Sequence, residues 1–213
     1  MKVLFISILA LLTTIQVYAQ DPLRFKADME KFKAMPVPEG EVTVITGSSS
    51  VRFWTDVNMD CDDSTIINTG FGGSQMSDLL YWIDEAVLRF KPSKVFIYEG
   101  DNDINDGKRS SEILDDLMVV VQKIFEHNPE AEIYVIGAKP SPSRWEHETR
   151  YLELNSILKM WCLRQKQISF IDVWRPMLTE ANRPKPEIFI ADSLHMNRKG
   201  YDIWRDAICK YMN

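Results

Sequence analysis

The sequence is poor in several residue types on which common active sites depend. Its 213 residues include three cysteines, three histidines and nine glycines. No two cysteines form a Cys-x-x-Cys pair, and none has the His and Asn context of a cysteine nucleophile. There is also no Gly-x-Ser-x-Gly elbow and no phosphate-binding glycine loop. Thiol chemistry and nucleotide binding therefore have no support in the motifs.

Basic charge is also in short supply. Lysine and arginine number 25 against 31 aspartates and glutamates, a net charge of −6. An acidic chain gains nothing electrostatically from a phosphate backbone or an anionic lipid surface. We therefore expect no nucleic acid among its partners.

The one leader-like apolar run lies at the N-terminus. A positive start at Lys2 precedes the apolar residues 3–12, and Ala19 closes a stretch typical of a cleavage site. The run is too short to span a bilayer permanently. The pattern predicts a secretory signal peptide over residues 1–19, export to the periplasm or the medium, and no membrane segment after cleavage. An uncleaved N-terminal anchor is the alternative. Residues 20–213 then suit a single domain.

The cysteines leave two interpretations open. Cys162 and Cys209 both lie in predicted helices near the C-terminus, so a disulfide between them is one interpretation. Three buried thiols, with Cys61 as the third, is the other.

Short β-prone runs alternate with stretches of helical spacing. The runs cover residues 42–46, 65–68, 94–98, 132–136 and 168–172, and apolar residues at helical spacing fill the intervals between them. A short helix is expected around residues 23–34. Alternation of this kind predicts an α/β fold with a parallel sheet and helices on both faces, because parallel strands need crossover connections.

Four polar clusters bear on function, and each follows a likely strand. They are residues 47–50 (Gly-Ser-Ser-Ser), 68–73, 100–103 and 192–195. In parallel sheets, ligands bind beyond the carboxyl ends of the strands. Ester hydrolysis needs a nucleophile, a base, and hydrogen-bond donors for the oxyanion. Each cluster alone could be a turn or a helix cap, but four in this order predict a hydrolase.

The base is best sought at His195. Asp192 precedes it by three residues, so the carboxylate can reach the imidazole and fix its tautomer while the other ring nitrogen faces a serine. His127 and His147 have no such arrangement. For the oxyanion, the glycine-dense turn 68–73 could supply N–H groups, and Asn102 a side-chain amide.

On these four clusters the chain resembles the SGNH hydrolases, the GDSL-type esterase and acylhydrolase family. The resemblance implies Ser49 as nucleophile, Asp192 and His195 as its partners, and an oxyanion hole made by Ser49, Gly73 and Asn102. It further implies a flavodoxin-like three-layer α/β/α sandwich of about five strands, with no metal or organic cofactor. The chain departs from the family at Ser48 and Ser74, where aspartate is frequent.

Two competing motifs are set aside. Residues 101–112 resemble a calcium loop, but the glycine stands at position seven instead of six, and a strand precedes the loop where a helix is required. Residues 156–159 fit Ser-x-x-Lys, yet the companion motifs of penicillin-binding enzymes are absent. No metal site is predicted.

Tryptophans and composition refine the hypothesis. Trp54 and Trp145 follow the nucleophile loop and the proline-rich loop, so we expect them to form a substrate wall, whereas Trp161 and Trp204 suit core packing. The leading hypothesis is an exported serine esterase that hydrolyses small acyl esters, O-acetyl groups on carbohydrates above all. A lysophospholipase or platelet-activating-factor-acetylhydrolase-like lipid esterase is the alternative, as is a non-catalytic carbohydrate-binding protein. Acyl length, alcohol moiety and oligomeric state stay open.

Overall fold

The computed structural model describes residues 21–212, so the predicted signal peptide lies outside the described residues. Its centre is a five-stranded sheet in which every pairing is parallel, with the order β2-β1-β3-β4-β5. The strands are β1 (Thr43–Gly47), β2 (Ile66–Gly70), β3 (Lys94–Tyr98), β4 (Glu132–Ile136) and β5 (Ile168–Ile171). This is the flavodoxin-like order. The predicted fold class and all five predicted strands are confirmed.

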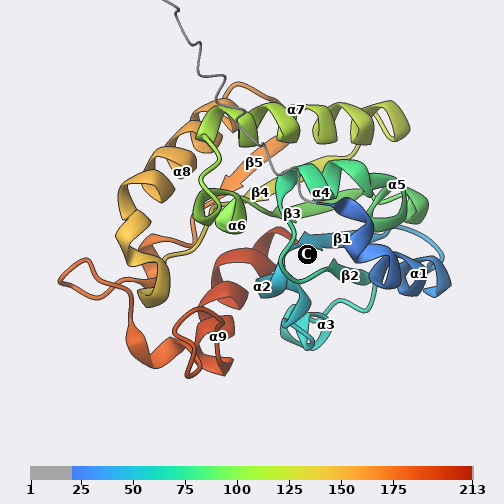
Figure 1. The fold of residues 1–213 in the computed structure, drawn as a ribbon. Coiled ribbons are helices and arrows are strands. Elements are labelled where there is room, and N and C mark those ends of the chain that lie inside the picture. Colours follow the sequence, from blue (N-terminus) through green and yellow to red (C-terminus); the bar gives the residue numbers. More distant parts are fainter. Residues whose placement is uncertain (1–20, 213) are drawn as a thin grey trace, which may run out of the picture.

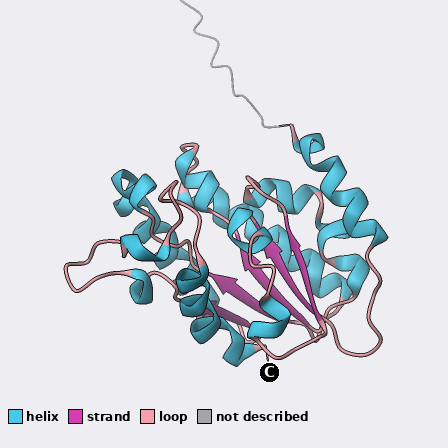
Figure 2. Cartoon of the chain, turned by 90° about the horizontal axis from the view of Figure 1, so that it is seen from below, coloured by secondary structure: helices cyan, strands magenta, loops and turns pink. Residues whose placement is uncertain are grey.

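Helices cover both faces of the sheet (Figures 1 and 2). The α-helices are α1 (Lys26–Ala34), α2 (Ser49–Arg52), α3 (Val57–Asp60), α4 (Met76–Tyr81), α5 (Ile83–Ala86), α6 (Asp101–Asn105), α7 (Ser110–His127), α8 (Glu148–Cys162) and α9 (Arg198–Ile208). Short 3-10 helices are η1 (Pro22–Phe25), η2 (Leu88–Phe90), η3 (Pro142–His147), η4 (Arg175–Met177), η5 (Pro186–Ile188) and η6 (Cys209–Tyr211). No helix within residues 21–212 combines the length and the apolarity needed to cross a bilayer.

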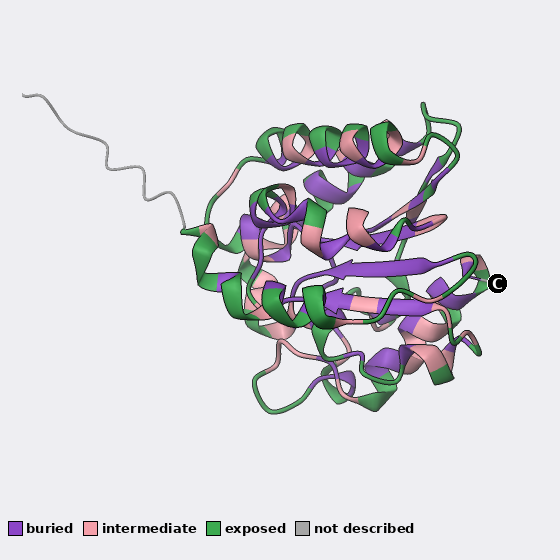
Figure 3. Ribbon diagram, turned by 90° about the vertical axis from the view of Figure 1, so that its right-hand side faces the viewer, coloured by how far each residue is buried: buried purple, intermediate pink, exposed green. Residues whose placement is uncertain are grey.

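Two hydrophobic cores form because strand residues alternate between the faces of the sheet. Val44, Ile97 and Val135 pack on one face with residues of α1, α4, α5, α7 and α8. Ile45 and Phe96 pack on the other face with residues of α2, α3 and α9. Figure 3 shows the result, with buried strands at the centre and helices exposed on their outer sides.

The carboxyl ends of β1 and β3 approach each other closely at Gly47. This residue has a positive φ of 138°, and a Cβ added to it would come within 2.0 Å of the Tyr98 carbonyl oxygen. The next residue, Ser48, donates its N–H to that same oxygen at 3.1 Å. Only glycine fits here, and the contact holds the start of α2 against the end of β3. The chain order reverses at this point of the sheet, which is where such folds bind ligands.

The disulfide differs from the pairing considered in the sequence. Cys61 bonds to Cys209, and their Cα atoms are 4.9 Å apart. Cys162 is a buried free thiol. The interpretation that paired Cys162 with Cys209 was wrong because α8 packs its Cys162 into the core on the opposite face of the sheet from Cys209. Sequence spacing cannot distinguish the two faces.

Candidate active site

Ser49 opens α2, directly after β1, and the surrounding elements hold that short helix from two sides. The Asn68 amide donates to the backbone oxygens of Val51 and Trp54, at 2.8 and 3.1 Å. From α9, the Tyr201 hydroxyl donates to the Ser50 carbonyl at 3.0 Å. A four-residue helix has little stability of its own, so these tertiary bonds fix the position of Ser49.

The structure brings Ser49, His195 and Asp192 into one chain of hydrogen bonds. The Nε2 atom of His195 lies 2.9 Å from the Ser49 Oγ, and its Nδ1 atom lies 2.6 Å from the Asp192 Oδ2. Because a carboxylate accepts, the Nδ1–H donates to Asp192 and Nε2 is left to accept the serine proton. The arrangement has the geometry of a nucleophile, a base and an orienting carboxylate.

Asp192 is held by its own segment of chain. Its Oδ1 accepts the backbone N–H groups of Leu194 and His195, both at 2.9 Å, and the intervening Ser193 has a left-handed φ of 58°. Burial alone would raise the pKa of Asp192, but the hydrogen bonds from the His195 ring, His195 N–H and Leu194 N–H outweigh it and lower the pKa to about 2. The carboxylate is therefore ionised throughout the neutral range.

The segment that carries His195 is tied to two neighbours. Ile190 donates its N–H to the His195 carbonyl at 2.9 Å, and the Asn197 side chain caps α9 by accepting from the Lys199 N–H at 2.9 Å. Ser143, in η3 after β4, donates its N–H to the Ser193 carbonyl at 3.1 Å. The loop after β4 therefore buttresses the turn between Asp192 and His195.

The glycine turn lies beside Ser49, and Asn102 is bound to the residue that follows this turn. A Cβ built on Gly72 would be 3.7 Å from the Ser49 Cβ, whereas one built on Gly73 would meet no atom within 4 Å. Gly73 has a φ of +85°, which a side chain would strain. The Asn102 Nδ2 donates one hydrogen to the Ser74 carbonyl at 2.8 Å. Its second hydrogen is the one that an oxyanion could use, and this role stays a prediction.

A buried charged network orients Asn102. Its Oδ1 accepts from Arg144 Nη2 at 3.0 Å, and Arg144 Nη1 binds Asp101 at 2.5 Å. Asp101 also accepts from Lys139 Nζ at 3.2 Å and from the Tyr151 hydroxyl at 2.9 Å. Burial would raise the pKa of Asp101, but Lys139 and Arg144 outweigh it and hold the pKa well below its usual range. The ionised Asp101 locks Arg144, and Arg144 fixes which way the Asn102 amide faces.

Ser74 is held in place by a hydrogen bond to the buried Glu99. The Ser74 Oγ donates to Glu99 Oε1 at 2.5 Å, and Glu99 is 1% exposed. Burial raises the pKa of Glu99 well above its usual range, and the neighbouring carboxylate of Asp103 raises it further. The surroundings of Glu99 therefore favour its protonated form. The Glu99 carboxyl group, directly after β3, thus anchors the loop that follows Gly73. At position 74 the loop has a serine in place of the aspartate that is frequent in the SGNH family.

Trp54 does not form a substrate wall, and that expectation is corrected. The side chain is 1% exposed, stacks on Tyr201 and donates its indole N–H to Asp60 at 2.7 Å. α2 ends at Arg52, and the chain beyond it directs the Trp54 side chain into the core. The preceding residue, Phe53, points outward instead. It is 49% exposed, and its ring lies edge-on to the His195 ring at 5.0 Å between centroids.

Trp145 is half-buried in η3. Its ring stacks on Trp174 at 5.8 Å, and the Arg183 guanidinium lies over its face at 4.9 Å. Its role as a wall stays a prediction. Trp204 is fully buried, as expected for a core residue.

Arg52 is the second residue that the sequence analysis missed. It is exposed at the end of α2, and its Nη1 and Cδ atoms would lie 3.3 and 3.6 Å from a Cβ on Gly72. The side chain therefore lies along the glycine turn, near Ser49. Its spacing of three residues from Ser49, one helical turn, was the signal that could have found it.

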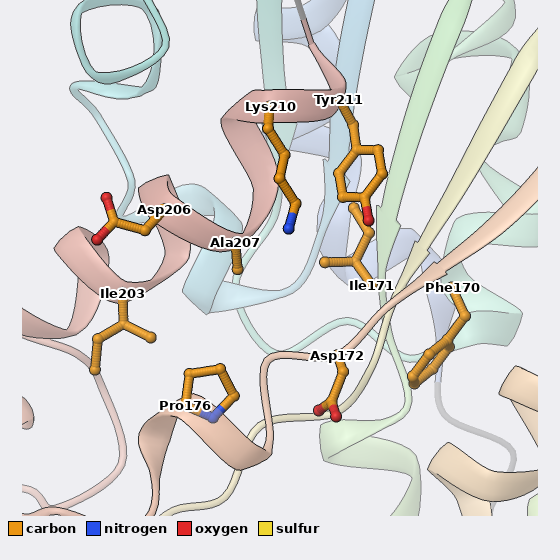
Figure 4. A pocket seen from close by; sticks show the side chains of 9 residues that line it. All are labelled: Phe170, Ile171, Asp172, Pro176, Ile203, Asp206, Ala207, Lys210 and Tyr211. Carbon is orange, nitrogen blue, oxygen red and sulfur yellow. The ribbon is translucent and has the colours of Figure 1, made fainter.

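A pocket of about 480 Å³ lies elsewhere, between β5 and α9, and none of the predicted site residues lines it (Figure 4). Its wall includes Phe170, Asp172 and Lys210. Within residues 21–212, no group of three or more His, Cys, Asp or Glu side chains is arranged to hold a metal ion.

Comparisons with known proteins agree with this architecture. The model of the GDSL-like Lipase/Acylhydrolase family matches residues 45–203, which include all four polar clusters. Platelet-activating factor acetylhydrolase IB subunit alpha1 from Bos taurus is 24% identical over 140 residues. That match covers 63% of this chain and 58% of the bovine protein.

Solved structures share the fold at low identity. A GDSL-like lipase from Bacteroides thetaiotaomicron has a TM-score of 0.75 at 17% identity and covers 90% of this chain and 98% of its own. A carbohydrate esterase family 3 protein from Talaromyces cellulolyticus has a TM-score of 0.66 at 18% identity and covers 80% and 96%.

Proposed function

The chain belongs to the GDSL-like lipase/acylhydrolase family and is a carboxylic ester hydrolase, and from that premise we propose that it is an exported serine esterase acting on small acyl esters. The observation that carries the proposal is the continuous chain from Ser49 Oγ through His195 to Asp192, with distances of 2.9 and 2.6 Å.

The proposed mechanism is a double displacement. His195 Nε2 takes the Ser49 proton as Oγ attacks the ester carbonyl, and the ionised Asp192 stabilises the imidazolium. The Ser49 and Gly73 N–H groups and the Asn102 amide hold the oxyanion. The imidazolium then gives its proton to the leaving alcohol. Water, activated by His195, hydrolyses the acyl-enzyme and restores Ser49.

The proposed substrate is an O-acetyl or similarly small acyl ester on a carbohydrate. The fold likeness to a carbohydrate esterase supports this choice. The similarity to a platelet-activating factor acetylhydrolase subunit favours a lipid ester as the second candidate, with the same triad.

Export is part of the proposal. It rests on the signal-like pattern of residues 1–19 and is supported by the Cys61–Cys209 disulfide, because disulfides persist mainly in oxidising compartments outside the cytosol. The periplasm and the medium both meet this condition.

The test is substitution of the proposed nucleophile. Ser49→Ala should lose turnover of 4-nitrophenyl acetate by at least about 10³-fold while keeping the thermal unfolding transition of the wild type. A fluorophosphonate probe should label the wild type and not Ser49→Ala. The matched control is Ser193→Ala, which removes a hydroxyl from the half-exposed turn beside His195 and should keep labelling. Wild-type protein that neither turns over esters nor takes the probe would support a non-catalytic carbohydrate-binding protein.

Hydrolysis rates for acetylated sugars, 4-nitrophenyl esters of rising chain length and lysophospholipids, each measured as the carboxylic acid or alcohol released, then separate the two candidate substrates. Fastest turnover of the acetylated sugars supports the carbohydrate esterase, and fastest turnover of lysophospholipids supports the lipid esterase.

A further inference from the structure

Arg52 is set apart from the other arginines by its lack of a partner. Within residues 21–212 the chain has eleven arginines. Nine of them make a hydrogen bond, an ion pair or a contact with an aromatic ring. Of the described arginines, only Arg52 and Arg164 make no such contact through their side chains. Arg164 lies after the end of α8.

The acidic side chains near Arg52 in sequence are engaged elsewhere. Arg198 on α9 binds Asp60 at 2.7 Å and lies 4.0 Å from Asp56. Trp54 also donates to Asp60. An exposed guanidinium in a chain with net charge −6 therefore keeps its charge unneutralised by these carboxylates.

The position of Arg52 is at the reacting centre. Its Nη1 atom and the Ser49 Cβ both lie within 3.7 Å of one point, the place that a Cβ on Gly72 would take. Because Gly72 has no side chain at this point, the Arg52 guanidinium can lie along the glycine turn. The exposed Phe53 ring lies edge-on to the His195 ring, with 5.0 Å between the ring centroids. A substrate bound at Ser49 would therefore lie near a guanidinium that has no side-chain partner and near an apolar ring.

We propose that Arg52 and Phe53 form a substrate subsite for esters that carry an anionic group, a carboxylate above all, close to the scissile bond. The inference rests on the proposed serine esterase function. A guanidinium presents paired N–H donors that match the two oxygens of a carboxylate. A bound carboxylate then supplies the partner that the chain itself does not give to Arg52. Because the rest of the protein is acidic, the preference for an anionic ester is confined to this site.

The anion can belong to either half of the ester, so the experiment has two arms. The first compares 4-nitrophenyl hemisuccinate with the uncharged 4-nitrophenyl butyrate, which places the carboxylate on the acyl half. The second compares acetylated glucuronic acid with acetylated glucose, which places it on the alcohol half. For each pair the quantity is the ratio of kcat/KM for the anionic ester to that for the neutral ester.

In at least one arm, Arg52→Gln should lower this ratio about tenfold through KM, since a hydrogen-bonded charge pair is worth roughly this much. Arg52→Glu should lower it further, and Arg52→Lys should restore part of it. The wild-type ratio should also fall as salt is raised. The matched control, Arg164→Gln, removes the other unpartnered arginine and should leave the ratio as in the wild type.

Ratios that Arg52→Gln changes no more than Arg164→Gln does, in both arms, would overturn the subsite. A different result would contradict the proposed function: no Ser49-dependent turnover of any ester by the wild type, the neutral esters included. The two outcomes are therefore distinguishable in one set of measurements.

Discussion

The two sides of Ser49 are built in opposite ways. On one side, Asp192 and His195 are three residues apart, and the bonds that orient the carboxylate run within their own turn. On the other side, Asn102 is oriented by Arg144, which is 42 residues away, and Arg144 is held by the buried Asp101. The base side is local and partly exposed, with 43% of the Asp192 side chain open to solvent. The predicted oxyanion side depends on the buried Asp101 and on contacts between distant segments of the chain.

The comparison shows why the two sides should respond differently to mutation. A local turn forms from its own sequence, so a change there alters the chemistry and leaves the fold intact. A buried charged network couples its members, so a change in one propagates to the others.

The largest effect is expected on the local side. Asp192→Asn keeps a side-chain oxygen for the Leu194 and His195 N–H groups but presents an amide to His195 Nδ1, which favours the wrong tautomer. We expect kcat to fall by about 10³- to 10⁴-fold, as for the equivalent change in a serine protease triad. Steady-state hydrolysis of 4-nitrophenyl acetate measures kcat for the variant and the wild type. Asp172→Asn, a carboxylate at the distant pocket, is the control and should keep wild-type kcat. A loss of less than tenfold would mean that Asp192 does not orient the base.

An intermediate effect is expected on the buried side. Arg144→Met removes the donor that fixes the Asn102 oxygen, so the amide can turn away, and kcat should fall roughly 10- to 100-fold with little change in KM. Asn102→Ala should cost more, about 10²- to 10³-fold.

The double variant separates positioning from a merely structural role. If Arg144 acts through Asn102, adding Arg144→Met to Asn102→Ala should lower kcat little further, because coupled residues are not additive. Full additivity of the two losses would contradict the positioning role.

The smallest effect on activity, and a distinct effect on stability, is expected at Glu99. Burial raises its pKa well above that of a carboxyl group in the unfolded chain. Between these two pKa values the folded state holds a proton that the unfolded state releases, so this group lowers stability as pH rises. Glu99→Gln stays neutral and can still accept from Ser74.

We therefore expect Glu99→Gln to unfold at a higher temperature than the wild type at pH 8, with the difference shrinking toward pH 5. Thermal denaturation followed by circular dichroism across this range measures it. Glu153→Gln, on the exposed side of α8, is the control and should show no such trend. A difference in unfolding temperature that is the same at pH 5 and pH 8 would contradict a raised pKa of Glu99 in the folded protein.

Much of the fold was predictable because strand and helix periodicity are local properties of the chain. All five strands were predicted within two residues of their observed ends. The same holds for the Asp192–His195 pair, whose spacing of three residues makes it a local structure. The SGNH resemblance, confirmed by the family match, rests on such short blocks.

The errors all concern direction in three dimensions. Trp54 was placed at the site, although the chain turns it inward after the end of α2 and leaves Phe53 exposed beside His195 instead. Cys162 was a candidate partner for Cys209 although the sheet lies between them. The hydrophobic periodicity of the sequence does not distinguish one residue from its neighbour at a helix end, or one face of the sheet from the other.

By itself, then, the sequence determined the parallel α/β sheet, the four polar clusters and the pairing of Asp192 with His195, because strand and helix periodicity, short motifs and a spacing of three residues are all properties of short stretches of the chain. Only the tertiary structure decided that Cys61 joins Cys209, that Glu99 anchors Ser74, that Arg144 orients Asn102, and that Arg52 has no partner. Burial and charge pairing decide these matters, and both depend on which distant segments the fold brings together.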